Sequence, residues 1–302
     1  ATQRDLSLTT VRRALDELAD QGLIIRRQGS GSYVTEHLPE QNGQRNVGVL
    51  LPSTTEYYPR VISGIEAALS QGSARLMLAC YHYDPAEEER DIASLLSSGV
   101  DGMILVPDLL SAPDPQAKLR RLFDLPVPVV LLERRDIGSG TSDRSEFVRT
   151  DHAGGAYDAV MHLHGLGHER IGLVCRYPNH TGVWVRRGYE DAVADLSLPT
   201  LPVDTAPADE WSAERADVAL SVLRDADASA ALVFGDREAA WLEGAARRAG
   251  LRIPEDLALV AYDDESAEFA EIPLTSVSPP KYTLGQLAAE TLLQRMDAGD
   301  LP

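Results

Sequence analysis

From Asn46 onward, short apolar runs alternate with amphipathic stretches of helical length, and this rhythm limits the possible folds more than any other feature of the chain. Strands that alternate with helices of about 10 to 15 residues form βαβ units and parallel sheets. We therefore predict an α/β fold with two doubly wound parallel-sheet subdomains, because residues 46–302 are many for one sheet. The apolar runs lie at residues 47–52, 74–80, 102–107, 127–132, 170–175, 231–235 and 257–263.

The first 34 residues have a different pattern, a helix followed by a hairpin. Ser7 is a suitable N-cap and Gly22 a suitable C-terminal residue for the helix. The turn at residues 29–31 contains two glycines, and strands on either side of it are expected to pair. One apolar stripe of the helix is formed by Val11, Ala14, Leu15 and Leu18, at i, i+3, i+4 and i+7 spacing.

Charge is distributed unevenly between these two regions. The whole chain has a net charge of −19, but residues 1–34 hold five arginines against four acidic residues. The remainder holds 23 basic and 43 acidic side chains. Such a surface repels polyanions, so only the first region is suited to contact nucleic acid.

Residues 35–45 are polar, contain Pro and Gly, and are predicted to be a linker. No apolar run approaches the ~20 residues that span a bilayer, so no membrane partner is expected. Cys80 and Cys175 each end an apolar run and are predicted to be buried free thiols. Free thiols suit a reducing compartment and predict a cytoplasmic protein.

Several motifs then identify resemblances. "SLTTVRRALDELADQGLIIRRQGSGSYV" resembles the recognition helix and wing of the GntR family of bacterial repressors. "VDGMILVP", "HLHGLGHERIGLV", "RRGYEDAV", "GLRIPEDLALVAYDD" and "PLTSVSPP" resemble the effector domain of the LacI/GalR family, in the family order. The combination is similar to that of the arabinose-repressor subgroup. In such a head a first helix and most of a second precede the position of Ala1, so residues 1–34 are expected to be a partial winged helix-turn-helix. The LacI/GalR family also has a last strand beyond the position of Pro302.

The resemblance implies that the head binds the major groove of DNA with its helix and the backbone or minor groove with its wing. Arginines suit guanine and phosphate, and threonine hydroxyls suit phosphate. On an isolated helix, Arg12 and Arg13 would pair with Asp16 and Glu17 just as well, but the wing at the right distance favours DNA. The predicted DNA contacts are Arg4, Ser7, Thr9, Thr10, Arg12, Arg13, Arg26, Arg27, Gln28 and Gly29.

For the body, the resemblance implies a small polar effector held between two subdomains that close on it. The first subdomain is expected at about 46–149 and 281–298, and the second at about 150–277. Carboxylates, an arginine and aromatic faces suit a polyhydroxylated ring. The candidates carried over by position are Ser53, Thr54, Tyr58, Tyr81, Asp108, Glu133, Arg134, Asn179, Thr181, Trp211, Asp236 and Asp263.

Some candidates have simpler structural explanations. Asp236 would serve equally as a helix cap, and Trp211 as core packing. Two positions depart from the family pattern: Val185 stands where an arginine commonly grips the ligand, and Gly235 stands where an asparagine is usual. Phosphorylated, acidic and nucleoside effectors therefore remain possible beside sugars.

The leading hypothesis is a homodimeric repressor whose two heads bind operator half-sites and which releases DNA when effector binds. A solute-binding protein of a sugar transporter is the alternative, but it would not need residues 7–34. No enzyme is predicted, because the chain has neither a nucleophile elbow nor a Walker loop. No cofactor or metal is expected either, since the histidines at 162, 164 and 168 are scattered around a helix.

Overall fold

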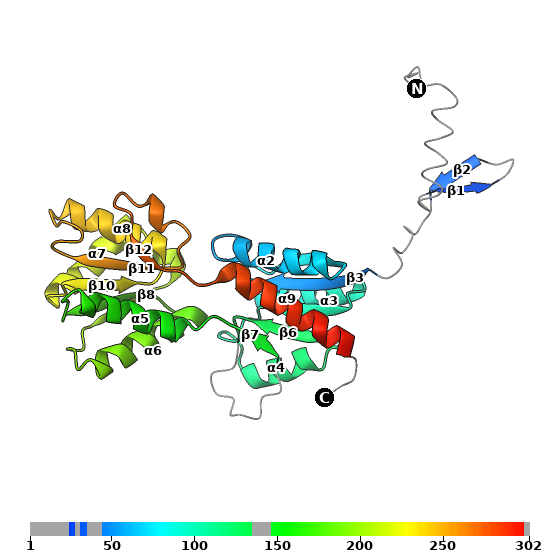
Figure 1. Cartoon of the computed structure of the whole chain (residues 1–302), viewed down its shortest axis with the longest axis horizontal. Coiled ribbons are helices and arrows are strands. Elements are labelled where there is room, and N and C mark those ends of the chain that lie inside the picture. Colours follow the sequence, from blue (N-terminus) through cyan, green and yellow to red (C-terminus); the bar gives the residue numbers. More distant parts are fainter. Residues whose placement is uncertain (1–23, 28–30, 35–43, 135–145, 299–302) are drawn as a thin grey trace, which may run out of the picture. The chain divides into compact units, whose positions relative to one another are not determined.

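The computed structural model describes residues 24–27, 31–34, 44–134 and 146–298. Its contacts divide the chain into two units, Ala1–Arg45 and Asn46–Pro302. In the first unit, β1 (Ile24–Arg27) and β2 (Gly31–Val34) pair antiparallel, with Arg27 opposite Gly31 (Figure 1). The predicted pairing of these strands is thus confirmed, whereas the helix predicted before them lies outside the described residues.

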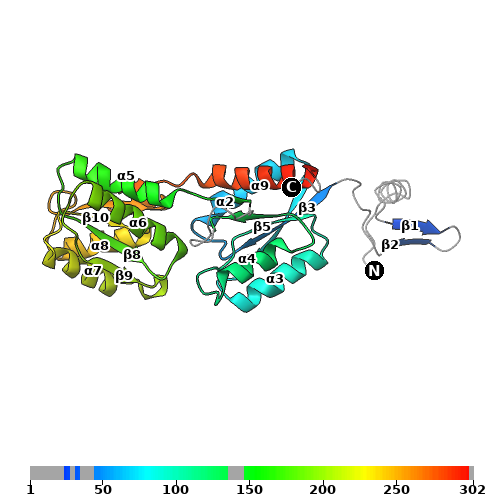
Figure 2. The same ribbon diagram turned by 90° about the horizontal axis from the view of Figure 1, so that it is seen from below.

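The second unit contains two sheets, and we call the sheet β4-β3-β5-β6-β7 with its helices the first subdomain. The pairs β3–β5, β5–β6 and β6–β7 are parallel. Helices α2 and α9 cover one face of this sheet, and α3 and α4 cover the other (Figure 2). The elements are β3 (Arg45–Leu51), α2 (Tyr58–Gln71), β4 (Ala74–Cys80), α3 (Pro85–Ser97), β5 (Gly102–Leu105), α4 (Pro115–Phe123), β6 (Val129–Leu132), β7 (Phe147–Val148) and α9 (Lys281–Ala298).

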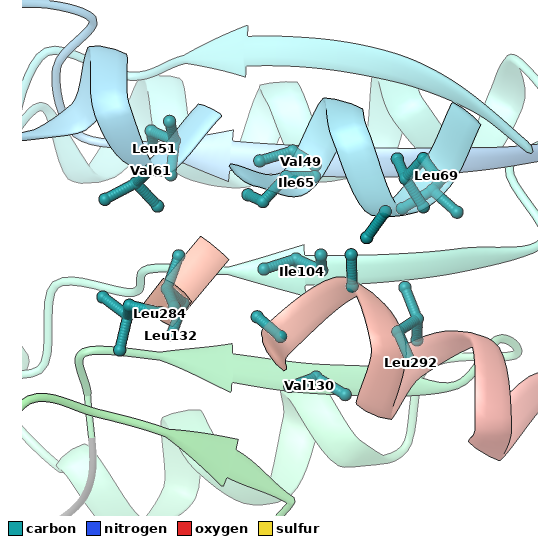
Figure 3. Close-up of a cluster of buried hydrophobic side chains, with 14 of the residues drawn as sticks. Val49, Leu51, Val61, Ile65, Leu69, Ile104, Val130, Leu132, Leu284 and Leu292 are labelled. Atoms are coloured by element: carbon teal, nitrogen blue, oxygen red, sulfur yellow. The ribbon is translucent and has the colours of Figure 1, made fainter. Parts of the chain in front are cut away.

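The two-residue period of the strands explains how both faces of this sheet are buried. Val47, Val49 and Leu51 of β3 point to one face, where they meet Ile65 of α2 and Leu292 of α9 in one core (Figure 3). Residues of the opposite parity form a second core under α3 and α4, which includes Leu50, Met103, Leu105 and Leu131. A strand buried on both faces needs a continuous apolar run, which is the pattern of residues 47–52.

Helix α9 is the last described element of the chain, yet it packs on α2 of the first subdomain (Figures 1 and 2). Two glycines lie where these helices approach each other. A Cβ on Gly64 would lie 2.0 Å from the carbonyl oxygen of Tyr282, and a Cβ on Gly285 would lie 2.0 Å from that of Val61. Only glycine permits so close an approach of two helix backbones.

The second subdomain is built on the sheet β12-β11-β10-β8-β9, whose neighbouring strands are parallel. Helices α5 and α6 share one buried core with this sheet, and α7 and α8 share the other. The elements are α5 (His152–Gly165), β8 (Ile171–Arg176), α6 (His180–Asp195), β9 (Val203–Ala206), the 3₁₀ turn η1 (Ala208–Glu210), α7 (Ala213–Asp225), β10 (Ala230–Val233), α8 (Asp236–Arg248), β11 (Ala258–Tyr262), η2 (Ala267–Phe269) and β12 (Thr275–Val277).

The predicted α/β class with two doubly wound sheets is therefore confirmed. The cysteine prediction is correct for Cys175, which is a buried free thiol, and wrong for Cys80, which is free but only half-buried. Cys80 is the last residue of β4, an edge strand whose burial is incomplete along its length. Within the described ranges, no helix combines the length and apolar character needed to cross a bilayer.

Candidate functional site

A cavity of about 640 Å³ is lined by residues of both subdomains. Its walls are formed by the segments that follow β3, β5 and β6 in the first subdomain and β8, β10 and β11 in the second. In open parallel sheets, the crevice outside the carboxyl ends of the strands is the general position for a ligand. The cavity occupies that position on two sheets at once.

Eight of the twelve predicted effector contacts line the cavity: Ser53, Tyr58, Asp108, Glu133, Arg134, Asn179, Thr181 and Asp263. The other four, Thr54, Tyr81, Trp211 and Asp236, are not among its lining residues. Thr54 is exposed, and its neighbour Thr55 lines the cavity instead. The role of each residue toward a ligand stays a prediction.

The remaining three of those four side chains are engaged within the protein. Tyr81 is fully buried, and its hydroxyl donates to a backbone carbonyl at 2.9 Å. Trp211 lies in the core beneath α7 and α8, with the Arg215 guanidinium 5.2 Å from its ring centre. Asp236 accepts hydrogen bonds from the Ser266 backbone at 3.0 Å and the Ser276 hydroxyl at 2.9 Å. It therefore fastens both the segment after β11 and strand β12 to the start of α8.

Glu133, directly after β6, is the best-satisfied carboxylate of the cavity. It accepts from the backbone and hydroxyl of Thr150, at 3.1 and 2.7 Å, and from the Tyr57 hydroxyl. The His152 Nε2 atom of α5 lies 3.2 Å from Glu133 Oε2. Burial opposes ionisation, but the contact with His152 and these hydrogen bonds outweigh it and lower the pKa of Glu133 to about 2. Glu133 is thus an anion that joins the first subdomain to the second.

Asp108 forms a second contact between the subdomains. Its Oδ1 lies 3.2 Å from Nε2 of His180, the first residue of α6, and accepts from the Leu110 backbone at 3.1 Å. Burial would raise the pKa of Asp108, yet His180 and the backbone donors lower it overall. Burial lowers the pKa of His180. Asn179 caps α6 by accepting from the Thr181 backbone at 2.9 Å, which fixes His180 at the cavity wall.

Arg176, the last residue of β8, anchors the opposite wall. Its Nη2 donates to Asp263 at 3.0 Å, and its Nη1 lies 3.6 Å from Glu56 of the first subdomain. The guanidinium also stacks on Phe234, with 4.5 Å between its carbon and the ring centre. Burial raises the pKa of Asp263 to about 6, against the opposing effect of Arg176.

Gly235 makes room for this arrangement. Its φ of 111° lies in a region that favours glycine. A Cβ there would lie 2.0 Å from the Glu238 carboxylate and 3.0 Å from Nη2 of Arg176. The Nε atom of Arg176 lies 3.9 Å from Glu238. Glycine at position 235, where the family usually has asparagine, therefore leaves the space that the side chains of Arg176 and Glu238 occupy.

The second departure, Val185, is a core residue of α6 with no exposed surface. The arginines that follow it point elsewhere: Arg186 binds Glu190 at 2.7 Å, and Arg187 lies 3.8 Å from Asp191. Neither arginine is among the cavity residues.

Several cavity residues escaped the sequence analysis, among them Tyr57, His152, Arg176, His180 and Arg237. Arg176 had a usable signal, because it is a charged residue directly after the apolar run 170–175. His152 had none, since its place at the cavity depends on how the second subdomain meets the first.

The structure gives little information on the predicted DNA contacts. Arg26 and Arg27 belong to strand β1. The other eight, Arg4, Ser7, Thr9, Thr10, Arg12, Arg13, Gln28 and Gly29, lie outside the described residues. All ten remain predictions.

Comparison with known proteins agrees with this two-part organisation. Residues 1–34 match the model of bacterial regulatory proteins of the gntR family, and residues 160–302 match that of the periplasmic binding protein-like domain. The arabinose metabolism transcriptional repressor of Geobacillus stearothermophilus is 28% identical over 98% of this chain and 83% of its own. The HTH-type transcriptional repressor CytR of Escherichia coli is 27% identical over 85% of this chain and 74% of its own.

Solved structures support the same fold. A LacI family transcriptional regulator from Enterococcus faecium with bound ribose has 27% identity and a TM-score of 0.67, covering 85% of this chain and 92% of its own. The complex of transcriptional regulator CelR with cellobiose has a TM-score of 0.72 at 24% identity, covering 99% and 88%. The chain is thus similar to gntR-family regulators in its first 34 residues, and to the periplasmic-binding-protein-like domain of LacI-type transcriptional regulators in the remainder.

Proposed function

We propose that this protein is a DNA-binding transcriptional repressor whose operator affinity is controlled by a small polar effector, a sugar or sugar derivative, bound between the two subdomains. The observation that carries the proposal is the cavity at the strand ends of both sheets, in a chain whose first 34 residues match a DNA-binding family. A ligand that contacts both walls stabilises one arrangement of the subdomains over others. A ligand can change the affinity for DNA only if it binds one arrangement of the subdomains more tightly than another.

The chemistry of the cavity supports a hydroxylated ligand. Carboxylates of Asp108 and Asp263 accept from hydroxyls, the Arg134 guanidinium donates to ring or carbonyl oxygens, and the Phe234 face packs against C–H groups. The names of the relatives, which include arabinose and ribose operon repressors, agree with this class.

The protein acts as a homodimer on a pseudo-palindromic operator, with one head on each half-site. It carries out no chemical reaction on its effector, in keeping with relatives that are regulators and not enzymes. As a DNA-binding regulator it works in the cytoplasm. The alternative of a solute-binding protein is disfavoured by the match of residues 1–34 to the gntR family.

Fluorescence anisotropy with duplexes from the region upstream of its own gene tests the proposal. We expect binding that weakens steeply with salt, because phosphate contacts release counterions. A panel of sugars and sugar derivatives should contain a compound that releases the duplex. The proposal is refuted if the full-length chain binds no upstream duplex. It is also refuted if every compound that binds the protein strengthens its complex with DNA.

A further inference from the structure

Apart from the exposed Asp209, the charges that line the cavity are balanced with one exception. Four carboxylates lie near cationic or imidazole partners: Asp108 near His180 at 3.2 Å, Glu133 near His152 at 3.2 Å, Asp263 near Arg176 at 3.0 Å, and Glu56 near Arg176 at 3.6 Å. In each pair the partner is supplied by the second subdomain. Arg237 adds a further cation 3.7 Å from Glu56.

Arg134 is the exception. It lines the cavity and is only 6% exposed, and no carboxylate oxygen of the residues that the structure describes lies within 4.0 Å of its guanidinium nitrogens. Its Nη1 donates to the backbone carbonyl of Glu133 at 3.3 Å, and the uncharged Tyr58 hydroxyl is a further hydrogen-bond partner of the guanidinium. The Nε–H is buried and has no acceptor in the described part of the chain.

The groups around Arg134 do not neutralise it. The phenols of Tyr58, Tyr81 and Tyr83 lie close enough to interact with the guanidinium, as does the Glu133 carboxylate. Burial raises the pKa of Tyr58 and of Tyr81 above the usual value of a phenol, so both are uncharged at neutral pH. The adjacent Glu133 carboxylate is already engaged by Thr150, Tyr57 and His152.

A buried charge without a counterion is costly to a folded protein, and such groups are retained where a ligand supplies the missing charge. We infer that the effector carries an anionic group, a carboxylate or a phosphate, that binds the Arg134 guanidinium. The inference rests on the proposed function and narrows its effector to sugar acids and sugar phosphates. A planar guanidinium with unused N–H donors suits both kinds of anion.

Matched sets of ligands test this directly by calorimetric titration of the full-length protein. Each set contains a neutral aldose, the corresponding aldonic acid and the corresponding sugar phosphate, for arabinose, ribose and glucose. One anionic member should bind about tenfold to a hundredfold tighter than its neutral parent, the range expected of a charge-assisted hydrogen bond. Which member is preferred distinguishes carboxylate from phosphate.

The variant Arg134→Met provides a readout that does not depend on finding the effector. Because it removes an unpaired buried charge, it should raise the Tm of the unliganded protein by about 2 °C or more. The matched control is Arg215→Met, which removes a half-buried arginine that donates to both oxygens of Asp204, at 2.8 and 2.7 Å. That variant leaves a carboxylate unpaired and should lower the Tm.

Inorganic phosphate serves as a probe of the same group. At equal ionic strength, phosphate should raise the Tm of the wild-type protein over that in chloride by more than it raises the Tm of Arg134→Met. The inference is overturned if each neutral aldose binds as tightly as its acid and phosphate, if Arg134→Met lowers the Tm, or if phosphate acts equally on both proteins. Release of DNA by a neutral sugar alone would overturn it while leaving the proposed function intact.

Discussion

Replacement of Glu133 by glutamine is a direct test of how the two subdomains are held together. The Glu133 side chain is 3% exposed and its carboxylate contacts Thr150, Tyr57 and His152, so its ionised form is strongly favoured in the folded state. Its pKa falls from an ordinary value of 4.5 to about 2 on folding. A difference of this size corresponds to about 3 kcal/mol of stability at neutral pH.

The sign of the pH dependence follows from the direction of this shift. A carboxyl group whose pKa is lower in the folded state binds fewer protons there, so its contribution is complete above pH 4.5 and is lost as the pH falls toward 2. Chemical unfolding followed by circular dichroism should show Glu133→Gln less stable than wild type by about 3 kcal/mol at pH 7. The difference between the two proteins should shrink steadily below pH 4.5.

Asp256→Asn is the matched control. The pKa of the Asp256 carboxyl group is likewise lowered to about 2 by hydrogen bonds from Arg252, but the Asp256–Arg252 pair lies on the surface. Salt screens exposed pairs, so any effect of the control substitution should disappear at high ionic strength, whereas the effect of Glu133→Gln should persist. Equal stability of wild type and Glu133→Gln at pH 7, or a difference that does not change down to pH 3, would refute the reasoning.

Three further substitutions have defined expected outcomes. Gly235→Ala should destabilise the protein by about 2 kcal/mol or more in urea unfolding, because its Cβ overlaps the Glu238 carboxylate at a φ of 111°; an unchanged midpoint would contradict the packing described. Arg176→Met leaves Asp263 buried without its cation and should lower the free energy of unfolding by about 3 kcal/mol or more in the same assay. This prediction fails if the double variant Arg176→Met/Asp263→Asn is no more stable than Arg176→Met alone. Tyr81→Phe should cost about 1 kcal/mol in thermal unfolding without changing effector affinity, since the hydroxyl donates to the backbone carbonyl of Val106; a large loss of affinity would place Tyr81 in the site.

The sequence predicted the sheets well because burial on both faces demands continuous apolar runs, as in residues 47–52 and 127–132. It also located cavity residues that directly follow such runs, including Asp108, Glu133 and Asp263. The rule failed at Tyr81, which follows β4 but is directed into the core.

The positions of other residues, inside and outside the cavity, depended on tertiary structure. Trp211 lies between η1 and α7, and its position in the sequence does not indicate that its ring packs in the core beneath α7 and α8. His152 and Arg176 reach Glu133 and Glu56 only because the two subdomains meet. Side-chain direction and the meeting of subdomains are set by packing over the whole unit, which local patterns do not contain.

The central claim is that occupation of this cavity controls binding to DNA. The most direct measurement is the ligand concentration that releases half of an upstream duplex, compared between wild type and Asp263→Asn, with the surface variant Asp256→Asn as control. We predict that Asp263→Asn raises this concentration at least about tenfold, the loss expected of one charge-assisted hydrogen bond, while DNA affinity without ligand is unchanged. The claim is contradicted if Asp263→Asn and the wild type release DNA at the same ligand concentration.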